Sequence, residues 1–341
     1  MATVTPRRDG PPAWLPPGRG TTRGDDGVAQ GPKPVDEASH TQAAASAIPV
    51  PVERRRIGAL ARRLALVRRL ARRVVRHPAY ALHVLRVLLG NPRLLLRALR
   101  HGWRTALLDH CQRLTPDLAG ILTRYDAGFF AQVFLFDEYE VERLPLGPTA
   151  QVLDVGANIG LFSWRVGRSH PGARILALEP QSENCVRLRQ VAAATGIQVE
   201  VCPCACGAFA GTARLYLRSS VTHSLDPAWH LDLADQGAAR RSEQVEVTTV
   251  DAVCDRRGLE GIDLLKVDVE GAEVDVLRGA SAMLARTRFV VLEYHSPDRR
   301  AACIELLRTA GFRCRDKSFW GLAAGNEGEG LLLADRPTAS A

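Results

Sequence analysis

The residues best placed for chemistry lie in one stretch, LLKVDVEGAEVDVLRGA, at positions 264–280. It begins as an apolar strand, ends that strand with Asp268 and Glu270, and continues after Gly271 as a helical pattern. Alternation along a strand would put Lys266, Asp268 and Glu270 on one face. Ligands bind at the carboxyl ends of strands in α/β sheets. Because two close carboxylates repel each other, the pKa of one should rise, so we expect Asp268 and Glu270 to act in general-base chemistry.

Neighbouring polar residues allow competing assignments. Glu273 and Asp275 fall in the first turn of the predicted helix, where acids suit the helix dipole, so we interpret them as helix-start residues. His223 lies in the loop SSVTHSLD, and His295 ends a later strand just after Glu293. Either imidazole could be a general base, because it titrates near working pH, or an ordinary surface or core residue.

Two groups of residues contain side chains that can ligate a metal. The paired carboxylates and Glu293 could supply oxygen ligands to a divalent cation, and the sequence does not decide whether one takes part. Cys202, Cys204 and Cys206 form C-x-C-x-C in a predicted strand, but no histidine or fourth cysteine stands at a zinc-finger spacing. We interpret them as small buried residues and predict no metal site.

A cofactor loop is indicated in VLDVGANIG, where Asp154 is followed by Gly156, Asn158 and Gly160. Glycines allow a sharp turn and close approach to a ligand, and the following helix start favours negative groups. The spacing is neither the dinucleotide G-x-G-x-x-G nor a P-loop. An acid at this strand end would repel a pyrophosphate and suits a cationic ligand. Glu179 ends the next predicted strand and can accept hydrogen bonds from a ribose diol. Together these features predict S-adenosylmethionine, which carries an ammonium, a sulfonium and a ribose.

The elements that must position these residues alternate between strand and helix from about residue 151 onward. We predict strands at 151–156, 174–180, 198–204, 263–269 and 288–295, and helices at 160–169, 181–195, 272–285 and 297–311. Strands at 212–217 and 244–250 flank a loop, and a last pair at 312–319 and 330–336 suggests an antiparallel edge hairpin. Alternation of this kind predicts an α/β fold with a mostly parallel sheet and helices on both faces.

Four blocks, VLDVGANIGLFS, LALEP, VTTVDAV and LLKVDVEGAEVDVLRGA, resemble the FkbM family of S-adenosylmethionine-dependent methyltransferases over about residues 150–335. The resemblance implies a class I methyltransferase (Rossmann-like) fold with a seven-stranded sheet. It also implies methylation of a hydroxyl on a sugar, a lipid-linked glycan or a polyketide. The family's cofactor loop and ribose acid match the residues just described. Asp251, Asp268, Glu270 and Gly271 match its later blocks.

The N-terminal part of the chain has a different composition. Residues 1–50, rich in Pro, Gly, Ala and Thr, are predicted to be a disordered tail, and residues 51–125 a basic helical segment before a domain at 126–341. No acid occurs from Arg54 to Leu108. Apolar residues at 53–76 follow a helical period with most arginines opposite, and further helices are predicted at 79–90 and 92–108.

This basic segment could lie on an anionic membrane or form a cap packed on the domain. Nucleic acid is disfavoured because no aromatic stacking residue occurs at 53–76. The net charge of +8 belongs mainly to this segment. The eight cysteines do not suggest a secreted framework, and we find no signal or membrane-spanning pattern. We therefore expect a cytoplasmic protein that contacts membrane, if at all, peripherally through residues 53–108.

The features together favour a methyltransferase acting on a hydroxyl-bearing small molecule or glycan. The alternative hypothesis is a catalytically inactive, methyltransferase-like adaptor associated with a membrane or partner protein. The intact cofactor loop argues against the adaptor. An NAD-dependent oxidoreductase is disfavoured by the glycine spacing.

Overall fold

The computed structural model describes residues 90–101, 103–123, 125–217, 223–225, 242–318 and 328–337. The tail predicted at 1–50 and the helices predicted at 53–76 and, but for its last residue, 79–90 lie outside these ranges. The contact of residues 53–108 with anionic lipid therefore stays a prediction, as do the domain boundaries at residues 50 and 125. No helix in the described part of the chain is long and apolar enough to cross a membrane.

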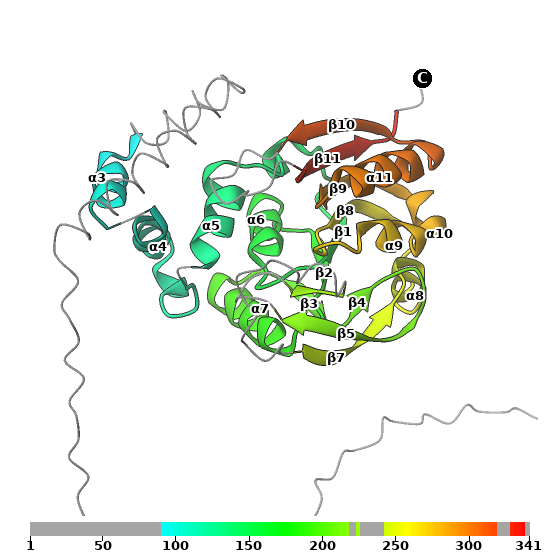
Figure 1. Cartoon of the computed structure of the whole chain (residues 1–341), viewed down its shortest axis with the longest axis horizontal. Helices are drawn as coiled ribbons and strands as arrows, with labels where there is room; N and C mark the ends of the chain where they lie inside the picture. Colours follow the sequence, from blue (N-terminus) through cyan, green and yellow to red (C-terminus); the bar gives the residue numbers. More distant parts are fainter. Residues whose placement is uncertain are drawn as a thin grey trace, which may run out of the picture. The chain divides into compact units, whose positions relative to one another are not determined.

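A seven-stranded sheet forms the centre of the fold (Figure 1). Its strands are β1 Gln151–Val155, β2 Arg174–Leu178, β3 Val199–Cys202, β8 Ile262–Val267, β9 Thr287–Tyr294, β10 Arg313–Ser318 and β11 Gly330–Asp335. Their order is β10-β11-β9-β8-β1-β2-β3. The five strands from β3 to β9 pair in parallel, and β11 pairs antiparallel with both β9 and β10. The predicted sheet and terminal hairpin are confirmed, and β11 inserts between β9 and β10.

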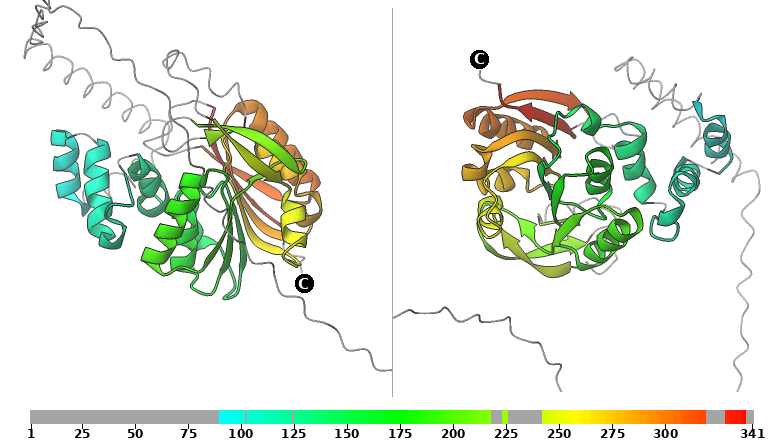
Figure 2. Two further views of the ribbon diagram at one scale, coloured as in Figure 1. Left: turned by 90° about the horizontal axis from the view of Figure 1, so that it is seen from below. Right: turned by 180° about the vertical axis from the view of Figure 1, so that it is seen from behind.

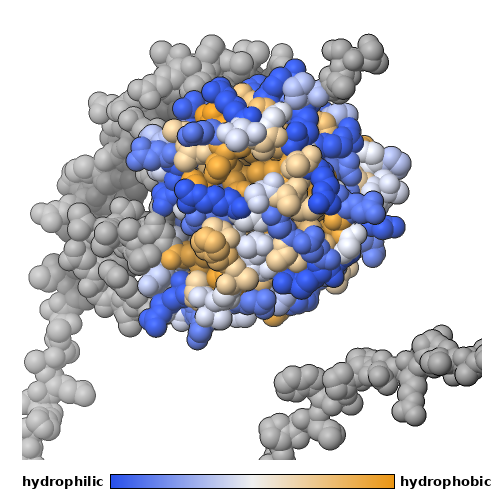
Figure 3. Space-filling model, turned by 90° about the vertical axis from the view of Figure 1, so that its right-hand side faces the viewer, coloured by the Kyte–Doolittle hydropathy of each residue, from blue (hydrophilic) through white to orange (hydrophobic). Residues whose placement is uncertain are grey.

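Helices cover both faces of this sheet (Figure 2, left). One face carries α6 Leu161–Ser169 and α7 Ser182–Thr195, and the other carries α8 Val250–Asp255, α9 Glu273–Arg278, α10 Ser281–Leu284 and α11 Pro297–Thr309. Alternate residues of a strand pack into two hydrophobic cores, one on each face of the sheet. Val152 packs in the cluster that contains Phe162 of α6, whereas Leu153 packs in the cluster that contains Val276 of α9. Seen from the side of the C-terminal helices, apolar areas of the surface are bordered by hydrophilic side chains (Figure 3).

The helix predicted at 272–285 is divided into α9 and α10 around Gly279. A Cβ atom on this glycine would lie 2.1 Å from the carbonyl oxygen of Gly207, so the two backbones approach too closely for any side chain. The strand predicted at 244–250 is displaced by two residues from β7, because β7 begins at Ser242 and Val250 already begins α8 after the Thr249 cap.

A second sheet was not predicted. It contains β4 Ala205–Cys206, β5 Gly211–Leu217, β6 His223–Ser224 and β7 Ser242–Thr248, in the order β4-β7-β5-β6. Because β3 ends at Cys202 and β4 begins at Ala205, the three cysteines do not share one strand as predicted. Cys204 and Cys206 are buried, as we expected of small core residues.

The segment before β1 is helical. It contains α3 Pro92–His101, α4 Trp103–Leu114, the 3-10 turn η1 Pro116–Leu118, α5 Asp126–Phe130, the π-helical turn η2 Ala131–Leu135 and the 3-10 turn η3 Val141–Arg143. The single helix predicted at 92–108 is thus two helices, α3 and α4, although its start at Pro92 is correct. An ion pair from Arg187 of α7 to Asp126, at 2.5 Å, ties this segment to the main domain.

Candidate active site

A cavity opens at the carboxyl ends of β1, β2 and β8. Its walls include Gly156, Asn158, Glu179, His223, Asp268 and Glu270, among other residues. Six of the eight residues proposed for the site from the sequence therefore border one space. The short strand β6 and its neighbours in the second sheet supply the wall that carries His223.

Gly156 lets two strand ends meet at the floor of this cavity. It has a φ of 75°, and a Cβ atom there would lie 1.7 Å from the carbonyl oxygen of Asp268. No other residue fits, because the backbone after β1 runs directly against the backbone after β8. The glycine of the predicted cofactor loop thus also sets the position of Asp268.

Glu179 is held by the loop that it faces. Its Oε2 accepts a hydrogen bond from the backbone N–H of Asn158 at 2.8 Å, and its Oε1 accepts one from Gln181 at 2.9 Å. Burial raises the pKa of Glu179 to about 7, although these hydrogen bonds oppose the shift. Asn158 adopts a left-handed conformation with φ 52°. The carboxylate is thereby fixed on the cavity wall with lone pairs to spare, as recognition of a ribose diol requires.

Asp154 and Gly160 of the predicted cofactor loop contact the protein interior rather than the cavity. The Asp154 carboxylate is fully buried, 3.1 Å from Lys266 Nζ, and accepts a hydrogen bond from Ser163 Oγ at 2.7 Å. Gly160 has a φ of 82° and lies against Leu188 of α7, where a Cβ atom would come within 2.8 Å. In this structure neither residue borders the cavity, so direct contact of either with a cofactor stays a prediction.

Lys266 links the two strand ends electrostatically. Its ammonium is fully buried, donates a hydrogen bond to the carbonyl of Gly156 at 2.7 Å and lies 3.6 Å from Asp268 Oδ2. Burial would lower the pKa of Lys266, but Asp154 and Asp268 raise it, so the lysine stays charged. One cation therefore neutralises part of the charge of two acids that come from different strands.

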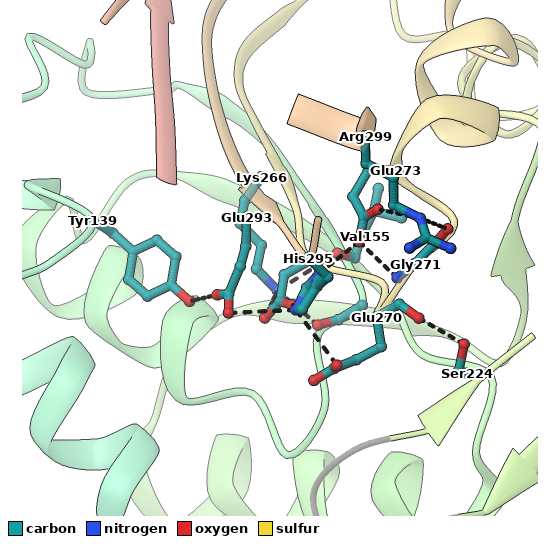
Figure 4. A network of polar contacts seen from close by, with 12 residues as sticks. Tyr139, Val155, Ser224, Lys266, Glu270, Gly271, Glu273, Glu293, His295 and Arg299 are labelled. Atoms are coloured by element: carbon teal, nitrogen blue, oxygen red, sulfur yellow. Dashed lines mark hydrogen bonds and ion pairs between the residues drawn. The ribbon is translucent and has the colours of Figure 1, made fainter. Parts of the chain in front are cut away.

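The predicted alternation of Asp268 and Glu270 along a strand is wrong. Strand β8 ends at Val267, and Glu270 lies in the following turn with a left-handed φ of 51°. The turn is fixed by Ser224 Oγ of β6, which donates a hydrogen bond to the carbonyl of Glu270 at 2.6 Å (Figure 4). The two carboxylates nevertheless converge on the same imidazole, because the turn brings Glu270 back toward β9.

That imidazole belongs to His295, which follows β9 and stands among four carboxylates (Figure 4). Its Nε2 lies 3.4 Å from Glu270 Oε2, 3.5 Å from Glu293 Oε1 and 3.9 Å from Asp268 Oδ1. Its Nδ1 lies 2.6 Å from Glu273 Oε1. Burial would lower the pKa of His295, but the surrounding carboxylates raise it well above its usual value, so the ring is an imidazolium.

Glu273 is more than the helix-start residue that we predicted. It is the first residue of α9, but its side chain is fully buried and bonds to His295. Its Oε1 also accepts a hydrogen bond from the N–H of Gly271 at 2.7 Å, and its Oε2 lies 3.7 Å from Arg299 Nε. Glu273 therefore fixes the orientation of the imidazole from the side away from the other carboxylates.

Two carboxylates of this cluster, Glu270 and Glu293, have raised pKa values. Loss of contact with water raises the pKa of Glu270 to about 8, and repulsion from Asp268 adds to the shift. The same two causes raise the pKa of Glu293 to about 7. The predicted rise of one carboxyl pKa is thus present at Glu270, with burial rather than mutual repulsion as its largest cause.

The sequence of the chain is similar to those of known proteins. The family model for the methyltransferase FkbM domain matches residues 154–314. Methyltransferase sdnD of Sordaria araneosa is 32% identical over 229 residues, which cover 58% of this chain and 87% of that protein. This chain belongs to the FkbM methyltransferase family. The predicted family is therefore confirmed.

Two further relatives differ in length. The 31-O-demethyl-FK506 methyltransferase FkbM of Streptomyces tacrolimicus is 31% identical over 212 residues, covering 52% of this chain and 81% of that protein. The AMB antimetabolite synthetase AmbE of Pseudomonas aeruginosa is 30% identical over 233 residues, covering 57% of this chain. The chain spans 11% of the length of AmbE. Family and sheet order together give a class I methyltransferase fold and imply methylation that depends on S-adenosylmethionine.

The residues of this FkbM domain fit that cofactor. Gly156, Asn158 and Glu179 would hold its adenosyl part, because they join a close backbone approach to a fixed, buried carboxylate on one wall. Asp268 and Glu270 border the same cavity on the side of the acidic cluster. A cofactor with a sulfonium is attracted by this excess of carboxylates.

The acidic cluster of the FkbM domain also has donors suited to a divalent cation. One ligand atom each of Asp268, Glu293 and His295 lies within 4.8 Å of the others. The His295 imidazolium already gives these carboxylates a counter-charge. Removal of divalent cations with a chelator tests whether one takes part.

Proposed function

We propose that the protein transfers a methyl group from S-adenosylmethionine to a hydroxyl of its acceptor at the acidic cluster. The observation that carries this proposal is the cavity itself: the fixed ribose-type acid Glu179 and the carboxylates Asp268 and Glu270 border one space. The first group is suited to bind the cofactor and the second to activate a hydroxyl. The name of the Streptomyces relative, 31-O-demethyl-FK506 methyltransferase FkbM, supports oxygen as the methylated atom.

The cofactor supplies an electrophilic methyl group on a sulfonium sulfur. The chain's own residues hold the acceptor oxygen in line with that methyl, which removes much of the entropic barrier. A carboxylate of the cluster would take the hydroxyl proton as the C–O bond forms and the bond from the methyl to sulfur breaks, so that the neutral thioether S-adenosylhomocysteine leaves. Asp268 and Glu270 are our proposed proton acceptors, and His223, on the wall that the second sheet supplies, is the competing one. The His295 imidazolium, held by Glu273, keeps the cluster compact.

The acceptors that fit are hydroxyl compounds such as sugars, glycolipids and polyketide-type natural products. Carboxylates accept hydrogen bonds from hydroxyls, so a cluster of them suits a molecule with several hydroxyl groups. The alternative, an inactive adaptor, would have no use for a fixed Glu179 or an open cavity. A cofactor titration separates the two, because only the enzyme needs to bind S-adenosylmethionine.

Glu179→Ala is expected to weaken S-adenosylmethionine binding by about 1.5–3 kcal/mol, the typical value of hydrogen bonds to a charged group. Calorimetric titration of the folded variant measures the loss. Glu183→Ala is the matched control, because Glu183 is an exposed acid in the first turn of α7 and should leave the affinity unchanged. Equal affinity of Glu179→Ala and wild type would remove Glu179 from the cofactor site.

A further inference from the structure

One contact to the acidic cluster comes from a segment that precedes the matched family domain. Tyr139 Oη donates a hydrogen bond to Glu293 Oε2 at 3.0 Å, although the two residues are 154 positions apart (Figure 4). The other oxygen of Glu293, Oε1, lies 3.5 Å from His295 Nε2. Tyr139 and His295 therefore hold the two oxygens of a single carboxylate, one from each side.

The ring of Tyr139 is locked in place by packing. The residue is 1% exposed and lies edge-on to Phe129 and to Phe162 of α6, with centroid distances of 6.4 Å and 5.2 Å. The ammonium of Lys266 lies 5.9 Å from the centroid of the same Phe162 ring. One aromatic ring thus packs against both Tyr139 and the buried lysine, so the hydroxyl has little freedom to leave Glu293.

The backbone around Tyr139 is held in an unusual conformation. The π-helical turn η2 precedes it, and Asp137 and Glu140 adopt left-handed conformations with φ 44° and 52°. Strained residues and π-helical turns of this kind gather at functional sites. Such backbone conformations persist only where neighbouring residues hold them in place.

The edge of the main sheet provides that fixation. Lys317 Nζ of β10 donates a hydrogen bond to the carbonyl of Glu138 at 2.7 Å and lies 3.1 Å from Glu140 Oε1. Arg315, also on β10, pairs with Glu140 Oε2 at 2.7 Å. These contacts to β10 hold residues 137–140 in the conformation that directs Tyr139 inward.

We propose that Tyr139 is a positioning residue of the active site, which holds Glu293 beside His295 so that the cluster presents a fixed set of oxygens to the acceptor. The inference rests on the proposed function. It extends the working site to the segment 131–141, outside residues 154–314. Tyr139 acts through Glu293 and need not touch the acceptor itself.

Tyr139→Phe tests this assignment, because it keeps the packed ring and removes only the hydroxyl. We expect kcat to fall by roughly 10–100-fold, the equivalent of one hydrogen bond to a charged group, with the Kd for S-adenosylmethionine unchanged. Tyr294→Phe is the matched control: it removes a hydroxyl that donates to Asp316 at 3.0 Å, one residue along the same strand as Glu293. The control should keep the wild-type kcat. A Tyr139→Phe variant as active as wild type, or equal losses in both variants, would overturn the proposal.

A double-mutant cycle with Glu293→Gln distinguishes positioning from a general loss of stability. If Tyr139 acts through Glu293, the double variant should be no slower than Glu293→Gln alone, whereas independent effects would multiply. Multiplied losses would overturn the proposal. Crystal structures test the proposal without an activity assay. The Glu293 carboxylate should contact His295 in the wild type and turn away from it in Tyr139→Phe. An unchanged position of Glu293 in the variant would contradict the proposal. A wild type that methylates no hydroxyl would instead refute the proposed function.

Discussion

Asp268→Asn is expected to lower turnover by about 10²–10⁴-fold while the fold and cofactor binding survive, if Asp268 is the base. Asparagine keeps the shape of the side chain and removes its charge. The carboxylate that is lost borders the cavity, 3.6 Å from Lys266 Nζ and 3.9 Å from His295 Nε2. The measurements are kcat at saturating cofactor, the Kd for S-adenosylmethionine and the melting temperature.

Asp275→Asn is the matched control, because Asp275 is an exposed acid of α9 that pairs with the exposed Arg278. It should keep full activity. If Asp268→Asn turns over normally and His223→Ala does not, the histidine is the base and our assignment is wrong. If a chelator abolishes wild-type turnover and Mg²⁺ restores it, Asp268 is a metal ligand instead. Unfolding of both Asp268→Asn and Glu270→Gln would make the two acids structural.

Lys266→Met is expected to lower the free energy of unfolding by about 3–5 kcal/mol, because it leaves a buried carboxylate without its counter-charge. Lys266 and Asp154 are both fully buried, and their charged atoms are 3.1 Å apart. Methionine fills similar space but also loses the hydrogen bond to the carbonyl of Gly156. Urea denaturation followed by circular dichroism measures the change.

Two further variants decide whether charge is the cause. Adding Asp154→Asn to Lys266→Met removes the orphaned charge and should restore much of the lost stability. Arg288→Met breaks an exposed pair with Asp263, also at 3.1 Å, and should cost about 0–1 kcal/mol. A Lys266→Met variant no less stable than Arg288→Met would show that the buried pair does not hold the two strand ends together.

The main sheet could be predicted because its signal is local. In the main sheet, β1, β2, β8 and β9 are runs of mostly apolar residues, each followed by a helix, so order along the chain implies parallel pairing. The second sheet could not be predicted as a unit, because β4 and β6 contain two residues each and carry no periodicity. Their existence depends on pairing with β7 and β5.

The sequence also indicated part of the cavity lining. Glu179 and Asp268 were predicted because each directly follows an apolar strand, and Gly156 because a turn must follow β1. Glu273 was misread, since an acid at a helix start looks the same whether it faces solvent or a histidine 22 positions away. Tyr139 gave no signal at all, because its contact with Glu293 depends on the fold of a segment without a recognisable pattern.

Asp154 shows the limit of motif spacing. The pattern D-x-G-x-x-x-G predicts an acid that faces the cofactor, whereas the structure turns this carboxylate inward to Lys266 and Ser163. The direction in which the Asp154 carboxylate points depends on which strand pairs with β1. The position of β8 next to β1 brings Lys266 against Asp154, and spacing within one strand cannot show that pairing.

The most direct test of methyl transfer to a hydroxyl follows the methyl group itself. The purified chain is incubated with S-adenosylmethionine carrying a carbon-13-labelled methyl and a panel of sugars, glycolipids and polyketides, and the products are examined by NMR. We predict a labelled methyl bonded to oxygen in one acceptor class, absent with Asp268→Asn. A label bonded to nitrogen or carbon, or a chain that does not bind S-adenosylmethionine in the same samples, would contradict the account.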